Sequence, residues 1–196
     1  MYKFTPKETS GQYDVLCHGN AYEVREVDLD RDLETLHTWM NHRHVAKFWK
    51  LDKPVDELRK HFVKHQADTH QKLYMLAKDG VDFAYFEKYS LEGDPFGKYI
   101  DYTDKDFGYH ILIGNPRMVG RGVLHDTLSI ITLTLFETED CQRVFGEPDV
   151  RVKPFIMICN ELGYKWRTMF EMPDKRANIF EITRETFYRK NEVLAC

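Results

Sequence analysis

The stretch 107–123, FGYHILIGNPRMVGRGV, constrains this chain most. It begins with an apolar run at 109–113 that lies between two glycines and is typical of a buried strand. Asn115 and Pro116 then indicate a turn. After Gly122 the apolar residues recur at helical spacing: Val123, Leu124, Leu128, Ile131 and Leu135. The sequence therefore predicts a strand, a glycine-containing turn and a helix in succession.

The predicted turn suits a diphosphate. The first turn of a helix has backbone N–H groups without partners and carries the positive end of the helix dipole. Gly120 and Gly122 let a phosphate approach the backbone, while Arg117 and Arg121 add positive charge. A β-to-α turn that merely contains two glycines would have the same pattern, so the loop alone leaves both interpretations open.

The wider context of this loop resembles a known family. The pattern R-x-x-G-x-G at 117–122, between a strand and a helix, resembles the acetyl-CoA pyrophosphate loop of the GNAT acyltransferases. Three further segments occur in the order found in the siderophore-biosynthesis branch of that family: GYH at 108–110, RVFGEPD at 143–149 and PDKRA at 173–177. The resemblance spans residues 22–182. It implies an α/β GNAT fold, with a mixed, mostly antiparallel central sheet flanked by helices and with splayed central strands.

The resemblance also implies an activity. An acyl-CoA N-acyltransferase of this branch transfers acetyl or succinyl from acyl-CoA to the hydroxylamine nitrogen of an N-hydroxylated diamine or N-hydroxylysine, on the way to hydroxamate siderophores. Acetyl-CoA or another acyl-CoA is then the co-substrate. An aminoglycoside-type N-acetyltransferase and a CoA-binding module without turnover are the alternatives. The amine, the acyl group and the oligomeric state, monomer or homodimer, are left open.

Two residues match catalytic positions of the family. His110 matches the histidine of the G-x-H segment, and Glu147 matches the acidic position of the [E/D]-P-D segment. Histidine titrates near neutrality, so we expect His110 to be the general base. Glu147 would orient it, hold the substrate or act through a water molecule. Without the resemblance, His110 would be read as a structural histidine and Glu147 as a solvated strand end.

The resemblance implies further contacts. The pantetheine arm is expected along the central strand, where a backbone N–H can stabilise the oxyanion. The expected cofactor-binding residues are Leu112, Ile113, Arg117, Val119, Gly120, Arg121, Gly122 and Val123. The far cation of the acceptor calls for a carboxylate or an aromatic face. The expected acceptor-binding residues, each of which could instead be core or surface, are Trp39, His44, Trp49 and Glu87. Tyr85 and Tyr89 are expected to serve packing.

The rest of the chain predicts further elements around these segments. Local pattern and capping signals indicate the following order: a short strand or arm within 1–20, a strand at 22–27, a helix from Asp28 or Asp30 to Met40, a break at 41–44, a helix from Pro54 to about Gln66, a hairpin with strands 73–77 and 81–87, a loop over the site at 90–106, a strand at 143–146, a helix at 153–161 and closing strands at 164–171 and 177–183.

Composition excludes several other classes. The 196 residues suit a single domain, residues 1–196. A net charge of −4 gives no electrostatic footprint for nucleic acid. The four cysteines are scattered and read as free thiols, and the nine histidines form no cluster with ligand spacing, so we expect no metal. No signal peptide or membrane span is evident, which predicts a cytoplasmic protein without membrane contact.

Overall fold

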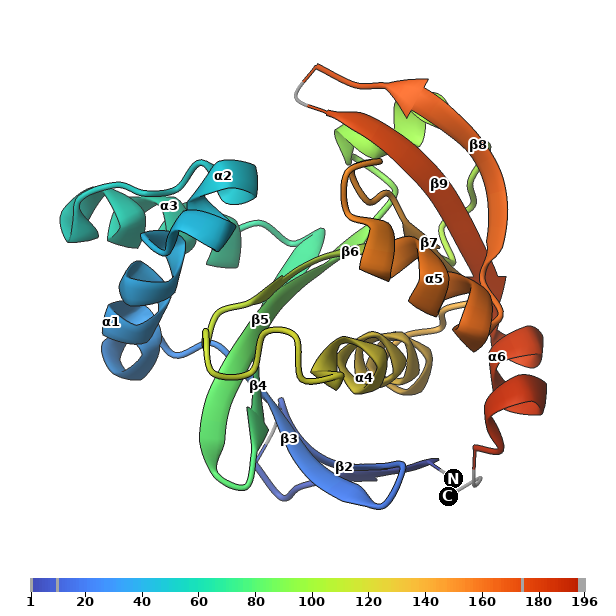
Figure 1. The fold of residues 1–196 in the computed structure, drawn as a ribbon, viewed down its shortest axis with the longest axis horizontal. Coiled ribbons are helices and arrows are strands. Elements are labelled where there is room, and N and C mark those ends of the chain that lie inside the picture. The colour runs from blue at the N-terminus through green and yellow to red at the C-terminus, as the bar shows by residue number, and fades with distance from the viewer. Residues whose placement is uncertain (1, 10, 174, 194–196) are drawn as a thin grey trace.

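The computed structural model describes residues 2–9, 11–173 and 175–193. Its centre is a nine-stranded sheet in the order β1-β2-β3-β4-β5-β6-β7-β9-β8 (Figure 1). The strands are β1 Tyr2–Pro6, β2 Gln12–Cys17, β3 Asn20–Glu26, β4 Gln71–Lys78, β5 Val81–Ser90, β6 Asp106–Ile113, β7 Arg143–Gly146, β8 Lys165–Glu171 and β9 Arg176–Thr183. Among the strand pairs of the described residues, only β6–β7 is parallel, so the predicted mixed, mostly antiparallel sheet is confirmed.

Helices cover both faces of this sheet. The helices are α1 Leu29–Met40, α2 Arg43–Trp49, α3 Val55–Gln66, α4 Val123–Thr138, α5 Lys153–Leu162 and α6 Arg184–Asn191, with a 3-10 helix at Pro95–Tyr99. Helices α1, α2 and α3 form one layer, and α4 lies in the hollow of the curved sheet on the other side (Figure 1). Strand β4 alternates accordingly: Leu73 and Met75 pack with the α1–α3 core, while Tyr74 and Leu76 pack with the α4 core.

The central strands separate at one point. Strands β6 and β7 pair only from Asp106↔Arg143 to Gly108↔Phe145. Beyond this, β6 continues to Ile113, whereas β7 ends before Pro148, which cannot donate to a ladder. At the paired end, the Arg143 guanidinium donates to the buried Asp106 carboxylate. The sheet is thus closed at one end of β6 and splayed at the other, as expected.

Elements with strong local signals match their predictions. Helix α1 follows Asp28, whose side chain accepts a hydrogen bond from the Asp30 N–H at 3.0 Å. Helix α3 follows Pro54. In the β4–β5 hairpin, Asp79 and Gly80 have φ of 51° and 73°, the conformation a two-residue I′ turn requires. Capping and turn chemistry act locally, so the sequence alone reveals these elements.

Three segments differ from their predictions or extend them. The break expected at 41–44 is wrong for its second half, because α2 already begins at Arg43; this helix has no side-chain cap and ends at Lys50 in the left-handed region, where glycine is usual. Helix α6 was not predicted, although Thr183 caps it by accepting from the Thr186 N–H. The possible strand or arm expected within 1–20 is two strands, the edge strand β1 and its neighbour β2.

Cys17, Cys141 and Cys159 are buried free thiols, as expected, and Cys196 lies outside the described residues. Within the described ranges, no helix combines the length and apolar character needed to cross a bilayer.

Candidate active site

The β5–β6 pairing places Glu87 directly opposite His110. Glu87 is nearly buried, with its side chain 5% exposed, and its Oε2 lies 3.1 Å from His110 Nδ1. Its other oxygen accepts a 2.7 Å hydrogen bond from the Tyr85 hydroxyl. Tyr85 and Glu87 are two positions apart on β5, so they share a face of the sheet. Both oxygens of Glu87 are therefore engaged within the protein.

Glu147 approaches His110 from the other side. It follows the last residue of β7, and its Oε1 lies 2.9 Å from His110 Nε2. The Tyr89 hydroxyl donates to the same oxygen at 2.9 Å, and Lys175 Nζ donates to Oε2. The structure thus brings the two expected catalytic residues together and adds Tyr89 and Lys175 around them.

A glycine makes room for this arrangement. The Tyr89 ring lies over Gly108 of β6, and a Cβ at position 108 would come within 2.4 Å of that ring. Because no side chain stands there, the Tyr89 hydroxyl crosses β6 to reach Glu147. The Tyr89 ring also lies 4.8 Å from the His110 ring, measured between centroids. Gly108 of the GYH segment therefore has a packing role beside the site.

The charges of this cluster stabilise one another. Burial disfavours a charged imidazole, but attraction and hydrogen bonds from Glu147 and Glu87 outweigh it and raise the pKa of His110 to about 10. Burial likewise opposes the charge of Glu147, yet His110 and Lys175 lower its pKa to about 2. The pKa of Glu87 is also lowered, against burial, chiefly by its hydrogen bond with His110. At neutral pH His110 is therefore an imidazolium with both N–H groups donated to carboxylates.

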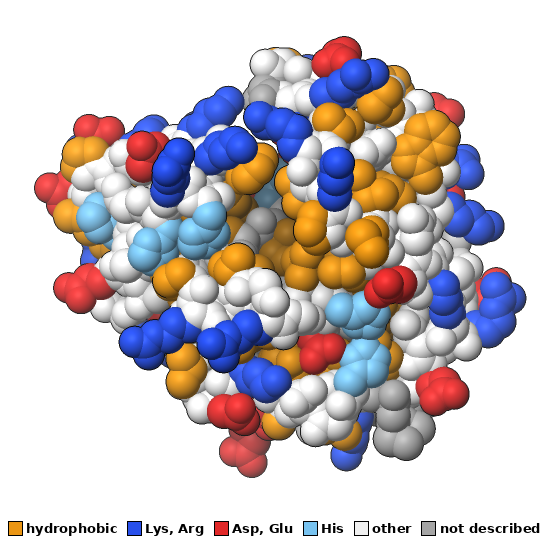
Figure 2. Space-filling model, in the orientation of Figure 1, with side chains coloured by type: hydrophobic (Ala, Val, Ile, Leu, Met, Phe, Trp, Pro, Cys, Tyr) orange, Lys and Arg blue, Asp and Glu red, His pale blue; other side chains and the backbone are white. Residues whose placement is uncertain are grey.

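The cluster opens onto a cavity of about 510 Å³. One wall is β6 from Tyr109 to Ile113, and the facing wall runs from Glu147 to Val152 with Phe155 of α5. Helices α2 and α3 close one end with residues that include His61 and His65. Figure 2 shows a hollow on this face, with hydrophobic side chains along it and lysines and arginines gathered at its rim. The His110 side chain is 40% exposed and lines the cavity.

The expected acceptor-binding residues divide into two groups. His44, Trp49 and Glu87 line the cavity. His44 Nε2 lies 2.9 Å from the Ile113 carbonyl oxygen, and Trp49 meets the His110 ring in an edge contact at 6.3 Å. Trp39 is absent from the cavity lining: it is buried in the α1–α3 core, with its ring over Gly114, where a Cβ would come within 1.9 Å of it. Trp39 therefore packs the core at the end of β6.

The expected cofactor-binding residues lie along β6 and in the loop after it. Leu112, Ile113 and Val119 line the cavity, and Val123 is the buried first residue of α4. Gly120 has φ of 76° and Gly122 has φ of 78°. Gly122 precedes α4 and provides no side-chain cap, so the first N–H groups of the helix are available to a ligand.

Arg117 and Arg121 are exposed on this loop. Within 2–9, 11–173 and 175–193, neither guanidinium forms an ion pair. Both side chains can therefore turn toward an anion at the α4 N-terminus.

Several residues of the buried cluster and of the cavity lining were not predicted as functional. Tyr85 and Tyr89 were expected only to pack, and they do so while also donating to the two carboxylates. Their spacing on β5 with Glu87 places all three on one face, which the alternation of the strand could have indicated. His61 and His65 are four positions apart on α3, a spacing that puts both on one side of the helix. Lys175 comes from a turn far away in sequence, and no local pattern reveals its contact.

The edge of β6 that the splay leaves open leads to a buried acid–base cluster. At the end of the same strand, a glycine-containing loop leads into α4. This arrangement defines an acyl-CoA N-acyltransferase. The family model described as Acetyltransferase (GNAT) domain matches residues 28–172, and the chain belongs to this family.

Known proteins support this placement. The chain is 31% identical to N-hydroxyputrescine acetyltransferase of Acinetobacter baumannii, over 88% of this chain and 83% of that protein. It is 28% identical to lysine N-acyltransferase MbtK of Mycolicibacterium paratuberculosis, over 79% of this chain and 71% of that protein. A crystal structure of an uncharacterized Bacillus halodurans protein matches with a TM-score of 0.87 and 29% identity, covering 93% of this chain and 95% of that chain.

Proposed function

We propose that this protein transfers an acyl group from acyl-CoA to the hydroxylamine nitrogen of an N-hydroxylated diamine or N-hydroxylysine, in hydroxamate siderophore biosynthesis. The names of the two relatives support N-acyl transfer to a hydroxylated amine or a lysine. The observation that supports the choice of a hydroxylated acceptor is the geometry of His110, whose two ring nitrogens lie 3.1 Å and 2.9 Å from the carboxylates of Glu87 and Glu147; these contacts raise the pKa of His110.

The acceptor must present a free lone pair on nitrogen. A plain alkylamine has a pKa near 10.4 and is a cation at neutral pH, so it must lose a proton before it attacks. A neighbouring hydroxyl group withdraws electrons and lowers the pKa of the nitrogen, so a hydroxylamine arrives neutral. An imidazolium cannot accept a proton before the attack. The site therefore suits an acceptor that needs no prior deprotonation.

The proposed reaction proceeds through a tetrahedral intermediate. The hydroxylamine nitrogen attacks the thioester carbonyl carbon, and the C=O π electrons move to oxygen. A backbone N–H near Leu112 or Ile113, on the strand edge left open by the splay, stabilises that oxyanion. The proton released by the nitrogen passes to the Glu147–His110 pair. The oxyanion electrons then re-form the C=O bond, the C–S bond breaks, and the departing CoA thiolate takes up that proton.

Other side chains would hold the substrates. Arg117, Arg121 and the α4 N-terminus are proposed to bind the CoA diphosphate. Trp49 and His44 are proposed to contact the acceptor, since both line the cavity beside His110. Glu87 is proposed to position His110, because both its oxygens are already bonded inside the protein.

Free-CoA release tests this function. Acetyl-CoA and succinyl-CoA are each supplied with N-hydroxyputrescine, N-hydroxylysine, the matching plain amines or an aminoglycoside. We expect turnover that requires the N-hydroxyl group and collapses in His110→Ala. Turnover of aminoglycosides equal to that of the hydroxylated amines would favour the alternative of an aminoglycoside-type N-acetyltransferase. CoA binding without acylation of any acceptor would favour a binding module.

A further inference from the structure

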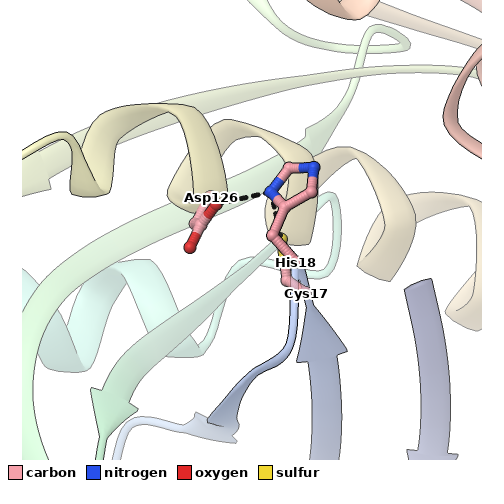
Figure 3. Close-up of side chains that lie close together, drawn as sticks. All are labelled: Cys17, His18 and Asp126. Atoms are coloured by element: carbon pink, nitrogen blue, oxygen red, sulfur yellow. Dashed lines mark hydrogen bonds and ion pairs between the residues drawn. The ribbon is translucent and has the colours of Figure 1, made fainter. Parts of the chain in front are cut away.

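A second cluster of titratable side chains lies outside the cavity, where the β2–β3 turn meets the first turn of α4 (Figure 3). Cys17 ends β2, His18 follows it in the turn, and Asp126 extends from α4 toward both (Figure 3). Cys17 Sγ, His18 Nδ1 and an Asp126 carboxylate oxygen all lie within 4.8 Å of one another. The proposed acyl transfer uses none of these three residues.

The surrounding hydrogen bonds determine which nitrogen of His18 carries a proton. The Ser129 hydroxyl donates to the His125 carbonyl oxygen at 2.9 Å, so it can only accept from the Tyr2 hydroxyl, at 3.2 Å. A hydroxyl has one hydrogen, so the Tyr2 oxygen must accept from His18 Nε2–H, at 2.9 Å. The chain of donors thus assigns a proton to Nε2 and turns Nδ1 toward the other two side chains.

Three electron-pair donors converge at this point. His18 Nδ1 lies 2.8 Å from Asp126 Oδ1 and 3.6 Å from Cys17 Sγ. The other Asp126 oxygen accepts a 2.5 Å hydrogen bond from the Tyr22 hydroxyl. A lone pair on Nδ1 and a carboxylate oxygen at this distance repel unless a positive species lies between them. That species is either a second proton on His18 or a metal ion.

We propose that Cys17, His18 and Asp126 bind a divalent transition-metal ion, with zinc the best match. Thiolate, imidazole and carboxylate are the ligand types of zinc sites. Zinc bond lengths of about 2.0–2.3 Å put tetrahedral ligand atoms roughly 3.5 Å apart. The Cys17–His18 separation of 3.6 Å matches that spacing, and the His18–Asp126 separation of 2.8 Å needs to open by roughly 0.7 Å. The thiol proton leaves to solvent as the metal–sulfur bond forms.

The second layer of contacts agrees with this assignment. Ligating histidines and carboxylates in metal sites are oriented by hydrogen bonds from their remaining polar atoms. Tyr2 supplies that contact for His18, and Tyr22 supplies it for Asp126. The His18 side chain is 42% exposed, which leaves the fourth coordination position open to water. Cys17 and His18 are adjacent while Asp126 lies 108 positions after His18, so sequence spacing could not reveal this set.

The placement indicates a structural role. The ion would tie the β2–β3 hairpin to α4, whose N-terminus follows the Arg117–Gly122 loop. The metal should therefore raise thermal stability without taking part in turnover. Activity of the acyltransferase and occupancy of this site can then be measured separately.

Cobalt substitution tests the proposal directly. The full metal-stripped chain is titrated with Co²⁺, and the near-ultraviolet thiolate-to-cobalt absorption is followed. We expect one Co²⁺ per chain, displacement by one equivalent of Zn²⁺, and loss of the band in Cys17→Ser. His18→Gln, a polar replacement at an exposed turn position, should weaken binding at least tenfold. Cys141→Ser and His37→Gln, elsewhere in the fold, should bind as the unaltered chain does.

Thermal unfolding with Zn²⁺ supplies the second readout. The midpoint should rise for the unaltered chain and both controls but not for His18→Gln, and CoA release should be unchanged in that variant. No thiolate band in the unaltered chain would overturn the proposal and favour a second proton on His18. A band that survives Cys17→Ser would also overturn it, because another cysteine would then be the ligand. Neither result would affect the proposed acyl transfer.

Discussion

The imidazole of His110 lies between two carboxylates that differ in their surroundings. Glu87 is tied to Tyr85 inside the α1–α3 side of the sheet, whereas Glu147 is tied to Tyr89 and Lys175 at the cavity wall. Interacting groups of this kind exchange protons as a unit, so His110 alone cannot be assigned the role of base. Among the residues of this cluster, the reaction should depend most on Glu147, which faces the gap where β6 and β7 separate.

Replacing Glu147 by glutamine removes one of the two charges that hold the His110 proton. We expect Glu147→Gln to lower kcat/KM by about 10²–10⁴-fold, because the carboxylate that takes up the proton of the acceptor nitrogen is then missing. The pKa of His110 should fall toward its ordinary value, as seen by NMR titration of the ring. Glu161→Gln, with a side chain 59% exposed, is the matched control. A Glu147→Gln enzyme as active as this control would contradict the assignment.

The His110 proton also predicts how stability depends on pH. The pKa of His110 is about 10 in the folded protein and about 6.5 when unperturbed, so proton binding favours the folded state. That stabilisation is complete below about pH 6.5 and is lost as the pH rises through about 10. In urea unfolding, the unaltered chain should therefore have a larger free energy of unfolding than His110→Gln, and this difference should shrink between pH 6 and pH 10. A difference that grows with pH would mean that the folded state holds a neutral imidazole.

Elements differ in how far the sequence reveals them. The predictions succeed for α1, α3, α5 and the β4–β5 hairpin because caps, turns and periodicity are local. Helix α2 was not predicted, because it is short, lacks a capping side chain and ends at a left-handed lysine. Its buried Val45 packs in the α1–α3 core, a contact that no local pattern reveals. Gly108 of β6 makes room for the Tyr89 ring beside the site, and Gly120 and Gly122 of the following loop have positive φ.

The loop before α4 allows a controlled test of its glycines. Gly122 and Gly80 both have positive φ, and a Cβ at either meets open space. Gly122→Ala and Gly80→Ala should each lower the free energy of unfolding by about 1–2 kcal/mol through the left-handed conformation. Only Gly122→Ala should raise the KM for acyl-CoA, because only Gly122 adjoins the α4 N-terminus. An equal change of KM in both variants would place the diphosphate elsewhere.

The close approach of Tyr89 to Gly108 gives a second prediction. A Cβ at position 108 would come within 2.4 Å of the Tyr89 ring and displace its hydroxyl from Glu147. Gly108→Ala should lower kcat about as much as Tyr89→Ala does. In the Tyr89→Ala background, Gly108→Ala should have little further effect, since the clash is gone. Fully additive losses in this double-mutant cycle would indicate that Gly108 acts through another contact.

The whole molecule assembles the site from segments far apart in sequence. The order of the family motifs was enough to predict the fold class and to name His110 and Glu147, because these motifs lie at fixed places on β6 and after β7. The contacts from Tyr89 and Lys175 could not be predicted, since they depend on how β5 and the turn before β9 meet the end of β7. The protonation of His110 follows from that assembly and from no single segment.

The chemical identity of the product tests the proposed function most directly. Acylation of the hydroxylamine nitrogen makes a hydroxamate, which forms a coloured complex with ferric iron, whereas an amide or an O-acyl ester does not. The protein is incubated with acyl-CoA and N-hydroxyputrescine or N-hydroxylysine, and ferric colour and product mass are measured alongside CoA release. We predict one hydroxamate formed for each CoA released, and none from putrescine or lysine. CoA release from plain amines at the same rate, without ferric colour, would contradict the proposed function.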